Sequence, residues 1–316
     1  MLEYRFAKLA AAATFVLLLI GGTVNPTGSS LACPEPTLVC HGHLFPHMTG
    51  GVLYEHGHRL AAMTVGLLQI VLTVLLFRRR REMRWIGLGA LLLVCVQGTL
   101  GAITVKYKLP TAVSVAHLMT AFIYFATLIY IAWRVRPGVE PGSKNTRNVG
   151  CCDLGKTRRW VLVATGVVFA QIVLGAIVRH TGAALACIDL PLCNGSLMPA
   201  HAPLPLVVHM LHRMGGVITG IVTITAAITV FRAARGYKTV RRLALAVPFL
   251  IVLQITLGLL TIYTLRYTPI AVAHFGGGVT LWGVWWAMTL TTTSRPAGAR
   301  RGLGDLPTNL AIKGAK

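Results

Sequence analysis

The chain has 316 residues, of which 55% are hydrophobic and 12% are charged, whereas about a quarter of the residues in a soluble domain are charged. A mean hydropathy of +0.69 excludes an ordinary water-soluble enzyme, a disordered chain and a small secreted disulfide domain. The formal net charge is +22, because 30 Lys and Arg stand against 8 Asp and Glu. Such an excess is typical of a nucleic-acid-binding protein or of a membrane protein with basic loops, and the positions of the charges distinguish the two.

Eight apolar segments are long enough to cross a bilayer, for which a helix needs about 20 mostly apolar residues. The gaps between them leave no room for a sizeable soluble domain. The sequence therefore predicts an all-α, polytopic membrane protein. The segments cover residues 8–25, 58–77, 85–105, 112–133, 160–178, 212–232, 243–263 and 270–292.

The basic residues gather on one side of these predicted helices. Of the 30 Lys and Arg, 24 lie at the N-terminus, in the gaps after the second, fourth and sixth segments, and in the C-terminal tail. Cytoplasmic loops of membrane proteins are rich in Lys and Arg, so both termini are expected in the cytoplasm. The basic residues therefore indicate which side of the membrane is cytoplasmic, and no nucleic-acid partner is expected. The six remaining basic residues lie on the other side: Arg59, Lys106, Lys108, Arg179, Arg213 and Arg266.

The chain repeats itself at an offset of 154 to 157 residues, as an internal duplication would produce. Each half is predicted to be a four-helix bundle, and the even number of helices makes the two copies parallel. We expect an N-terminal half at 1–137, a cytoplasmic linker at 138–158, a C-terminal half at 159–294 and a cytoplasmic tail at 295–316. The matches include His58-Arg59 with His212-Arg213, Gln97-Gly98-Thr99-Leu100-Gly101 with Gln254-Ile255-Thr256-Leu257-Gly258, and Ala116-His117 with Ala273-His274.

The N-terminal segment has an alternative interpretation. Arg5 and Lys8, the apolar run and Ser30-Leu31-Ala32-Cys33 together have the pattern of a cleaved signal peptide or a lipoprotein site. The same pattern recurs between Gly175 and Cys187, in mid-chain, where no cleavage is expected. We therefore interpret the first segment as a membrane helix of the repeat.

Four of the eleven histidines stand at repeat-related positions, each at or just inside the start of an even-numbered segment. These segments run from outside to inside, so all four rings are expected at similar depth near the outer face. A polar ring in hydrocarbon is costly and usually functional, although a single one can simply hydrogen-bond between helices. Two rings per half favour axial ligation of a metal macrocycle such as haem, whereas zinc needs four ligands. The four are His58, His117, His212 and His274.

Three further residues adjoin these histidines. Arg59 and Arg213 directly follow His58 and His212, where a guanidinium can clamp a haem propionate or extend to the outer headgroups. Glu55 lies three residues before His58, at a position that the other half fills with a histidine. A carboxylate there can take or deliver protons, or can stabilise the start of a helix. The asymmetry suggests that one half reacts and the other holds a cofactor.

Cysteine pairs lie in two predicted outer loops, which face an oxidising compartment, so disulfides are plausible there. Either pair can be a structural staple or redox-active, and the presence of Glu55 in the first half slightly favours a functional role for the first pair. Cys95 is expected to be a buried apolar filler. The loop pairs are Cys33 with Cys40 and Cys187 with Cys193.

In combination, these motifs resemble those of the heme A synthase family. The resemblance covers the whole chain except the linker and the tail, and the combination is specific where any one motif alone is not. The family oxidises the C8 methyl of haem O to a formyl group, through the alcohol, and so supplies haem A to terminal oxidases. The resemblance also implies a location in the cell membrane. The motifs are an outer-loop cysteine pair, Glu55-His56-Gly57-His58-Arg59, Val115-Ala116-His117, His212-Arg213 and Val272-Ala273-His274.

The resemblance implies a role for each half. His58 and His117 match the pair at which substrate haem O binds, and His212 and His274 match the ligands of a haem b cofactor. Glu55 matches the functionally important glutamate of the family, and both cysteine pairs match the loop pairs of bacterial members. Contacts with a haem O synthase or a terminal oxidase are also implied, together with an electron donor of unidentified nature.

Two other functions compete with this interpretation. A bis-histidine cytochrome b that passes electrons from quinol would hold two permanent haems of one type and convert neither. A transporter would also explain the duplication. Transporters usually bind their substrates near the midplane of the membrane, whereas the polar residues here are expected near the outer face.

Overall fold

The computed structural model describes residues 1–137, 154–235 and 238–293. These ranges contain no β-strand, only isolated backbone bridges, so the all-α prediction is confirmed for them. The predicted tail and most of the predicted linker lie outside the described residues. The helices are α1 (Leu2–Val24), α2 (Gly50–Arg79), α3 (Arg84–Lys106), α4 (Thr111–Arg134), α5 (Leu154–His180), α6 (Leu204–Ala233), α7 (Lys238–Tyr263) and α8 (Thr268–Thr293), with short 3-10 helices η1 (Arg81–Met83) and η3 (Ala183–Leu185).

Seven of these helices, α1 to α7, are long and apolar enough to cross a membrane. Helix α8 has 26 residues and no charged side chain, but its Gly, Thr and Trp residues lower its hydropathy. Its hydroxyl groups bond within the helix: Thr280 donates to the carbonyl of Gly276 (2.9 Å) and Thr292 to that of Met288 (2.9 Å). Such bonds satisfy polar groups in apolar surroundings. The protein is a multi-pass membrane protein.

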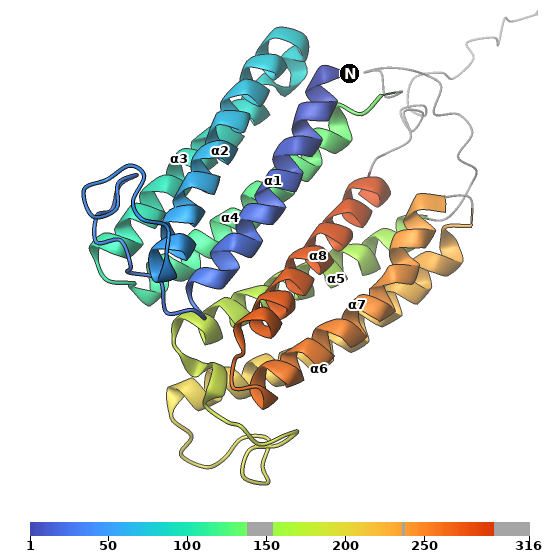
Figure 1. The fold of residues 1–316 in the computed structure, drawn as a ribbon. Helices are drawn as coiled ribbons and strands as arrows, with labels where there is room; N and C mark the ends of the chain where they lie inside the picture. Colours follow the sequence, from blue (N-terminus) through green and yellow to red (C-terminus); the bar gives the residue numbers. More distant parts are fainter. Residues whose placement is uncertain (138–153, 236–237, 294–316) are drawn as a thin grey trace, which may run out of the picture.

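Two four-helix bundles lie side by side, with α1–α4 in one and α5–α8 in the other (Figure 1). In the first bundle α1 contacts α2 and α4, and α3 contacts α2 and α4. The second bundle repeats this pattern, since α5 contacts α6 and α8, and α7 contacts α6 and α8. The shared arrangement agrees with the internal repeat in the sequence.

The two bundles share a packed core. Helix α8 contacts α1 and α4, and α5 also contacts α4. The indole of Trp282 donates a hydrogen bond to the carbonyl of Phe122 (3.1 Å), and that of Trp286 donates to the carbonyl of Ala126 (2.8 Å). Phe122 and Trp282 belong to one buried cluster with residues of both halves. The halves are therefore fixed relative to each other by side-chain packing.

Helix α1 is an integral part of the first bundle. It packs on α2, α4 and α8. Near its start the Glu3 carboxylate forms an ion pair with Arg80 (2.9 Å), which follows α2. These contacts favour the interpretation of the first segment as a membrane helix of the repeat.

Helices α2 and α6 begin earlier than their hydropathy predicts, at Gly50 and Leu204. His58 and His212 are each the ninth residue of their helix, so their predicted position at the helix start is wrong by about two turns. His117 and His274 are each the seventh residue of α4 and α8. The two copies therefore place their histidines at matched helix positions, while their depth in the membrane stays a prediction.

Candidate functional site

His212 on α6 and His274 on α8 face each other in the second bundle. Their ring centroids are 6.4 Å apart and the rings are perpendicular, at 90°. An imidazole nitrogen binds a metal ion at about 2 Å, so two rings on opposite sides of one ion have centroids roughly 6 Å apart. The pair therefore has the separation needed to ligate one ion axially.

A cavity of about 390 Å³ opens between these two rings. Its volume lies in the range of small-molecule and cofactor sites, which are mostly apolar with a few polar groups. Phe122 and Leu118 of the first bundle also line it, so the cavity lies next to the interface between the halves. The polar groups that line it include Gln171, Gln254 and both histidines.

Two glutamines hold the histidines of the second bundle. His274 Nδ1 lies 3.1 Å from the carbonyl of Gln254, and because a carbonyl only accepts, Nδ1 carries the proton and Nε2 keeps its lone pair. Metal-binding histidines are usually oriented in this way. The Gln254 amide also donates to the carbonyl of His274 (2.8 Å). The Gln171 amide donates to the carbonyl of His212 (2.8 Å) and lies 3.0 Å from His212 Nδ1.

Glycines on the neighbouring helices make room for the rings. A Cβ at Gly175 would lie 3.0 Å from Cε1 of His212, and one at Gly258 would lie 3.1 Å from Cε1 of His274. The first bundle has the same arrangement, with Gly21 against His58 and Gly101 against His117. Each of the four rings thus lies against a glycine, and at Gly21, Gly175 and Gly258 a larger residue would crowd the ring.

His58 and His117 form the corresponding pair of the first bundle. They occupy the positions equivalent to His212 and His274, each against a glycine of a neighbouring helix. The Gln97 amide donates to the carbonyl of His117 (3.0 Å), as Gln254 does for His274, but Leu17 stands at the position equivalent to Gln171. Within the described residues, neither His58 Nδ1 nor His117 Nδ1 has a hydrogen-bond partner, although both atoms are buried. The rings of the first bundle are therefore held less firmly than those of the second.

Glu55 lies on α2 beneath the first long loop and is only 5% exposed. One carboxylate oxygen forms an ion pair with Arg59, at 2.6 Å. The other accepts a hydrogen bond from the backbone N–H of Cys33, at 2.9 Å. Glu55 thus joins the helix that carries His58 to the disulfide loop.

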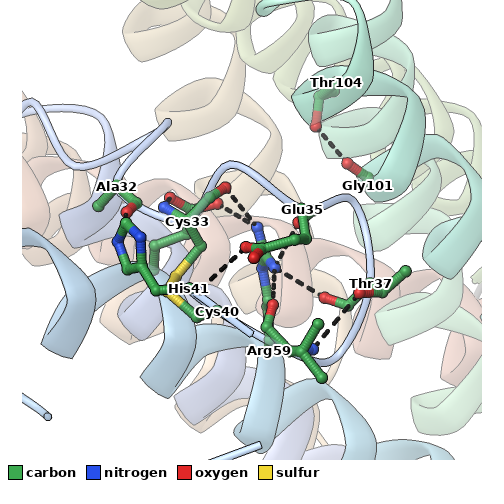
Figure 2. Close-up of polar contacts among 11 residues, drawn as sticks. Ala32, Cys33, Glu35, Thr37, Cys40, His41, Arg59, Gly101 and Thr104 are labelled. Atoms are coloured by element: carbon green, nitrogen blue, oxygen red, sulfur yellow. Dashed lines mark hydrogen bonds and ion pairs between the residues drawn. A yellow bond between two sulfur atoms is a disulfide. The ribbon is translucent and has the colours of Figure 1, made fainter. Parts of the chain in front are cut away.

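Arg59 lies at the centre of the same loop (Figure 2). Its Nη1 donates to the carbonyls of Glu35 (2.7 Å), Thr37 (2.7 Å) and Val39 (3.0 Å), and its Nη2 donates to that of Cys33 (3.1 Å). Both terminal nitrogens are therefore engaged by the loop. Clamping a haem propionate, as the sequence suggests, stays a prediction that requires some of these bonds to be exchanged.

Arg213 holds the second long loop in the same way. Its Nη1 donates to the carbonyl of Asp189 (2.7 Å), its Nη2 donates to that of Cys187, and its Nε lies 3.3 Å from a ring nitrogen of His209. The two arginines are therefore equivalent loop anchors, and the propionate role of Arg213 also stays a prediction.

Both predicted disulfides are present, Cys33–Cys40 and Cys187–Cys193. A ring nitrogen of His56 and the two sulfur atoms of the first pair lie within 4.8 Å of one another. The second pair packs against Met210, which stands at the position equivalent to His56. The first disulfide therefore has a polar neighbour and the second an apolar one.

Glu35 shapes the first loop from its exposed side. Its carboxylate accepts hydrogen bonds from the backbone N–H groups of His41 (3.0 Å) and Gly42 (2.9 Å). Desolvation acts to raise the pKa of Glu35, but these hydrogen bonds and one from its own backbone outweigh it, so the pKa lies below the usual value. The carboxylate form thus stabilises the turn at His41.

A family model for COX15-CtaA, described as cytochrome oxidase assembly protein, matches residues 47–286. The chain belongs to this family. Its relatives include the heme A synthase of Bacillus pumilus, 27% identical over 286 residues that cover 86% of this chain and 90% of the relative. The heme A synthase of Lysinibacillus sphaericus is 30% identical over 280 residues, 85% and 88% of the two chains. In this COX15-CtaA member, the matched region contains Glu55 and all four paired histidines.

The glutamines and glycines that contact the four histidines were not predicted as site residues. Gln97 and Gln254 match in the repeat, and so do the glycines that support the rings. This recurrence could have identified the two glutamines from the sequence, because a glutamine in an apolar segment needs a hydrogen-bond partner. Gln171 has no counterpart in the first half, so only the structure reveals its contact with His212.

Proposed function

We propose that this protein is a heme A synthase, a membrane oxidoreductase that converts the C8 methyl of haem O into the formyl group of haem A. The observation that carries the proposal is the pair of facing imidazoles, His212 and His274, at 6.4 Å across a cavity. The family match and the named relatives identify the reaction class. The conversion removes four electrons and adds one oxygen atom, in two steps through the alcohol.

The residues of the second bundle fit a haem b cofactor. Two rings have the separation for axial ligation, Gly175 and Gly258 leave room beside them, and the carbonyl of Gln254 fixes the tautomer of His274. When bound, haem b supplies one-electron redox chemistry. The protein contributes the ligands, their orientation and a cavity with largely apolar walls.

The first bundle is proposed to bind the substrate, haem O, between His58 and His117. Outer contacts that orient a metal-binding histidine typically raise metal affinity about 10- to 100-fold. In the described structure neither His58 Nδ1 nor His117 Nδ1 has such a contact, whereas His274 Nδ1 donates to the Gln254 carbonyl and His212 is held by the Gln171 amide at its backbone carbonyl and beside its ring. A substrate must leave after conversion, whereas a cofactor must stay bound. Weaker binding of haem by His58 and His117 therefore suits a substrate site in the first bundle.

Glu55 is proposed to serve proton transfer at the substrate site. It lies one helical turn before His58, and the second bundle has His209 at the equivalent position. Its carboxylate is held between Arg59 and the Cys33 N–H, so it accepts a proton only as one of these bonds weakens.

The haem sites are proposed to lie near the outer face of the cell membrane. All four histidines are close to the helix ends that carry the disulfide loops, and disulfides persist in oxidising compartments. Most basic residues of the described part of the chain lie toward the other end, as expected for a cytoplasmic side. The proposed halves are residues 1–137 for the substrate and 159–294 for the cofactor.

Extraction and chromatography of the haems bound to the purified full chain test the function. The protein is produced in cells that make haem O and, separately, in cells that do not. We expect haem B in both preparations, with haem O and haem A only in the first. Haem B alone in both, at two per chain, would instead identify an electron-carrying cytochrome b.

A further inference from the structure

We propose that Arg179 and Arg266 bind the carboxylate groups of the haem held between His212 and His274. The inference rests on the proposed function, because it assigns further residues to the cofactor site of that function. In this proposal Arg179 and Arg266, and not Arg213, bind the anion in this cavity. The terminal nitrogens of Arg213 already donate to carbonyls of the second loop.

Arg179 lies near the end of α5 and lines the cavity. Its Nη2 donates to the carbonyls of Gly21 (3.2 Å) and Gly22 (3.1 Å), and its guanidinium lies 5.3 Å from the ring centroid of Phe275. Its Nε is buried and has no hydrogen-bond partner among the described residues. A buried donor without an acceptor is costly, so a ligand that supplies an acceptor would bind favourably there.

Arg266 lies in the turn between α7 and α8 and lines the same cavity. Its Nη2 donates to the side-chain oxygen of Asn25, at 3.1 Å. The positive charges of Arg266 and Arg179 are near enough to repel each other. None of the ion pairs in the described part of the chain includes either arginine. Two adjacent cations at a poorly solvated cavity are unfavourable unless an anion lies between or beside them.

The first bundle has no arginine at either of the equivalent positions. The repeat places Asn25 at the position equivalent to Arg179, and Leu109 at the position equivalent to Arg266. The equivalence of the turns is supported by their shared backbone, since Leu109 and Arg266 both have positive φ, 65° and 67°. The charge pair is therefore specific to the half that we propose to hold the cofactor.

The chemistry of the arginines matches that of the ligand. Haem carries two carboxylates on one edge, and a guanidinium binds a carboxylate through two parallel hydrogen bonds. Arg179 has Nε free for such a contact, and the Arg266 guanidinium donates only to Asn25 in the described structure. A lipid phosphate would offer similar acceptors, so the experiment must separate the two anions.

Binding of haem b and of its dimethyl ester to the full chain, purified without haem, tests the proposal. The ester keeps the iron and the macrocycle but lacks both negative charges. We expect the wild type to bind the free acid about 10- to 100-fold more tightly than the ester. Arg179→Asn and Arg266→Leu, which install the first-bundle residues, should each lose most of this preference while binding the ester like the wild type.

Three further variants complete the experiment. Arg179→Lys keeps the charge but not the paired donors, so it should retain part of the preference. Arg235→Gln removes an exposed charge from the other end of the bundle and should leave the preference unchanged. Arg213→Gln tests the clamp expected from the sequence, and a loss of preference there but not in Arg179→Asn would overturn the proposal.

The remaining outcomes separate this proposal from the function on which it rests. A wild type that binds haem through His212 and His274 but does not distinguish acid from ester would overturn the carboxylate assignment alone. Equal affinities together with competition by added anionic lipid would assign the arginines to a lipid phosphate instead. A wild type that binds neither compound would overturn the haem b site as well.

Discussion

Glu55 and His209 occupy equivalent positions in the two bundles and bind the same backbone group of the loop above them. Glu55 accepts from the N–H of Cys33 at 2.9 Å, and a ring nitrogen of His209 accepts from the N–H of Cys187 at 3.4 Å. Each also contacts the arginine four residues later. The loop contact is therefore common to both halves, and the negative charge belongs only to the first.

Replacement of Glu55 separates these two roles. We expect Glu55→Gln to lower haem A formation at least about tenfold, because the amide keeps an acceptor for the Cys33 N–H but cannot take up a proton. Haem B content should stay at the wild-type level. The measurement is chromatography of haems extracted from equal amounts of purified protein.

Glu55→His is the matched comparison, since it installs the residue of the second bundle. It should also lose haem A formation while its first loop stays closed, which can be followed by protection of the Cys33 amide from hydrogen exchange. Full haem A formation in Glu55→Gln, whose amide cannot take up a proton, would show that Glu55 acts only as a loop contact.

The histidine pairs should respond differently to substitution. His212→Ala or His274→Ala removes one of two proposed iron ligands and should reduce bound haem B at least about tenfold, as read from the visible absorption spectrum. His58→Ala or His117→Ala should leave haem B in place and abolish haem A formation. An unchanged haem B content in the His212 and His274 variants would contradict the assignment of the cofactor site.

Gln171→Leu tests whether the Gln171 amide helps to hold the cofactor that we propose for the second bundle. The substitution installs the residue found at position 17, and it removes the amide that bonds the carbonyl of His212 and lies beside its ring. We expect haem b to dissociate about 10- to 100-fold more readily, with the helices intact. Transfer of haem from the protein to an excess of a haem-binding acceptor gives the rate, and a rate equal to that of the wild type would mean that the ring is oriented by other contacts.

Much of the fold is readable from the sequence, because each membrane helix is a long apolar run and the repeat fixes the pairing of the halves. The starts of α2 and α6 are not. In α2 the residues from Tyr54 to Arg59 interrupt the apolar run, and in α6 Pro205 and His209 interrupt it. Those residues are helical because the loop satisfies them, as the bonds of Glu55 and Arg59 show. A hydropathy profile does not take account of hydrogen bonds to a distant segment, so it places the starts of these helices too late.

The lipid-facing side of a helix is equally hard to predict. Cys95 is apolar enough for a core, but it is exposed on α3, so its predicted burial is wrong. In a membrane protein apolar residues serve both the bundle core and the lipid, and composition does not distinguish them. The site residues were more predictable, because a histidine or a glutamate in such surroundings needs a partner wherever it lies.

The first loop should loosen in acid because of Glu35. Its pKa is below the ordinary value of 4.5, so the carboxylate stabilises the turn fully above that value and loses this effect as the pH falls through the lowered pKa. Hydrogen exchange at the His41 and Gly42 amides, corrected for intrinsic rates, should show protection that disappears in this acid range. Glu35→Gln should show low protection at every pH, and an identical pH profile for the two proteins would assign the protection to other groups.

The two disulfides are expected to differ in function. Cys33 is tied to Glu55 through its backbone and the first pair lies beside His56, whereas the second pair packs against Leu206 and Met210. Replacing both cysteines of the first pair with Ser should therefore lower haem A formation, because the loop that positions Glu55 is no longer closed. The same change in the second pair should lower thermal stability but leave haem A formation per folded molecule near the wild-type level. Equal losses of activity in the two double variants, at matched amounts of folded protein, would mean that both disulfides act only as staples.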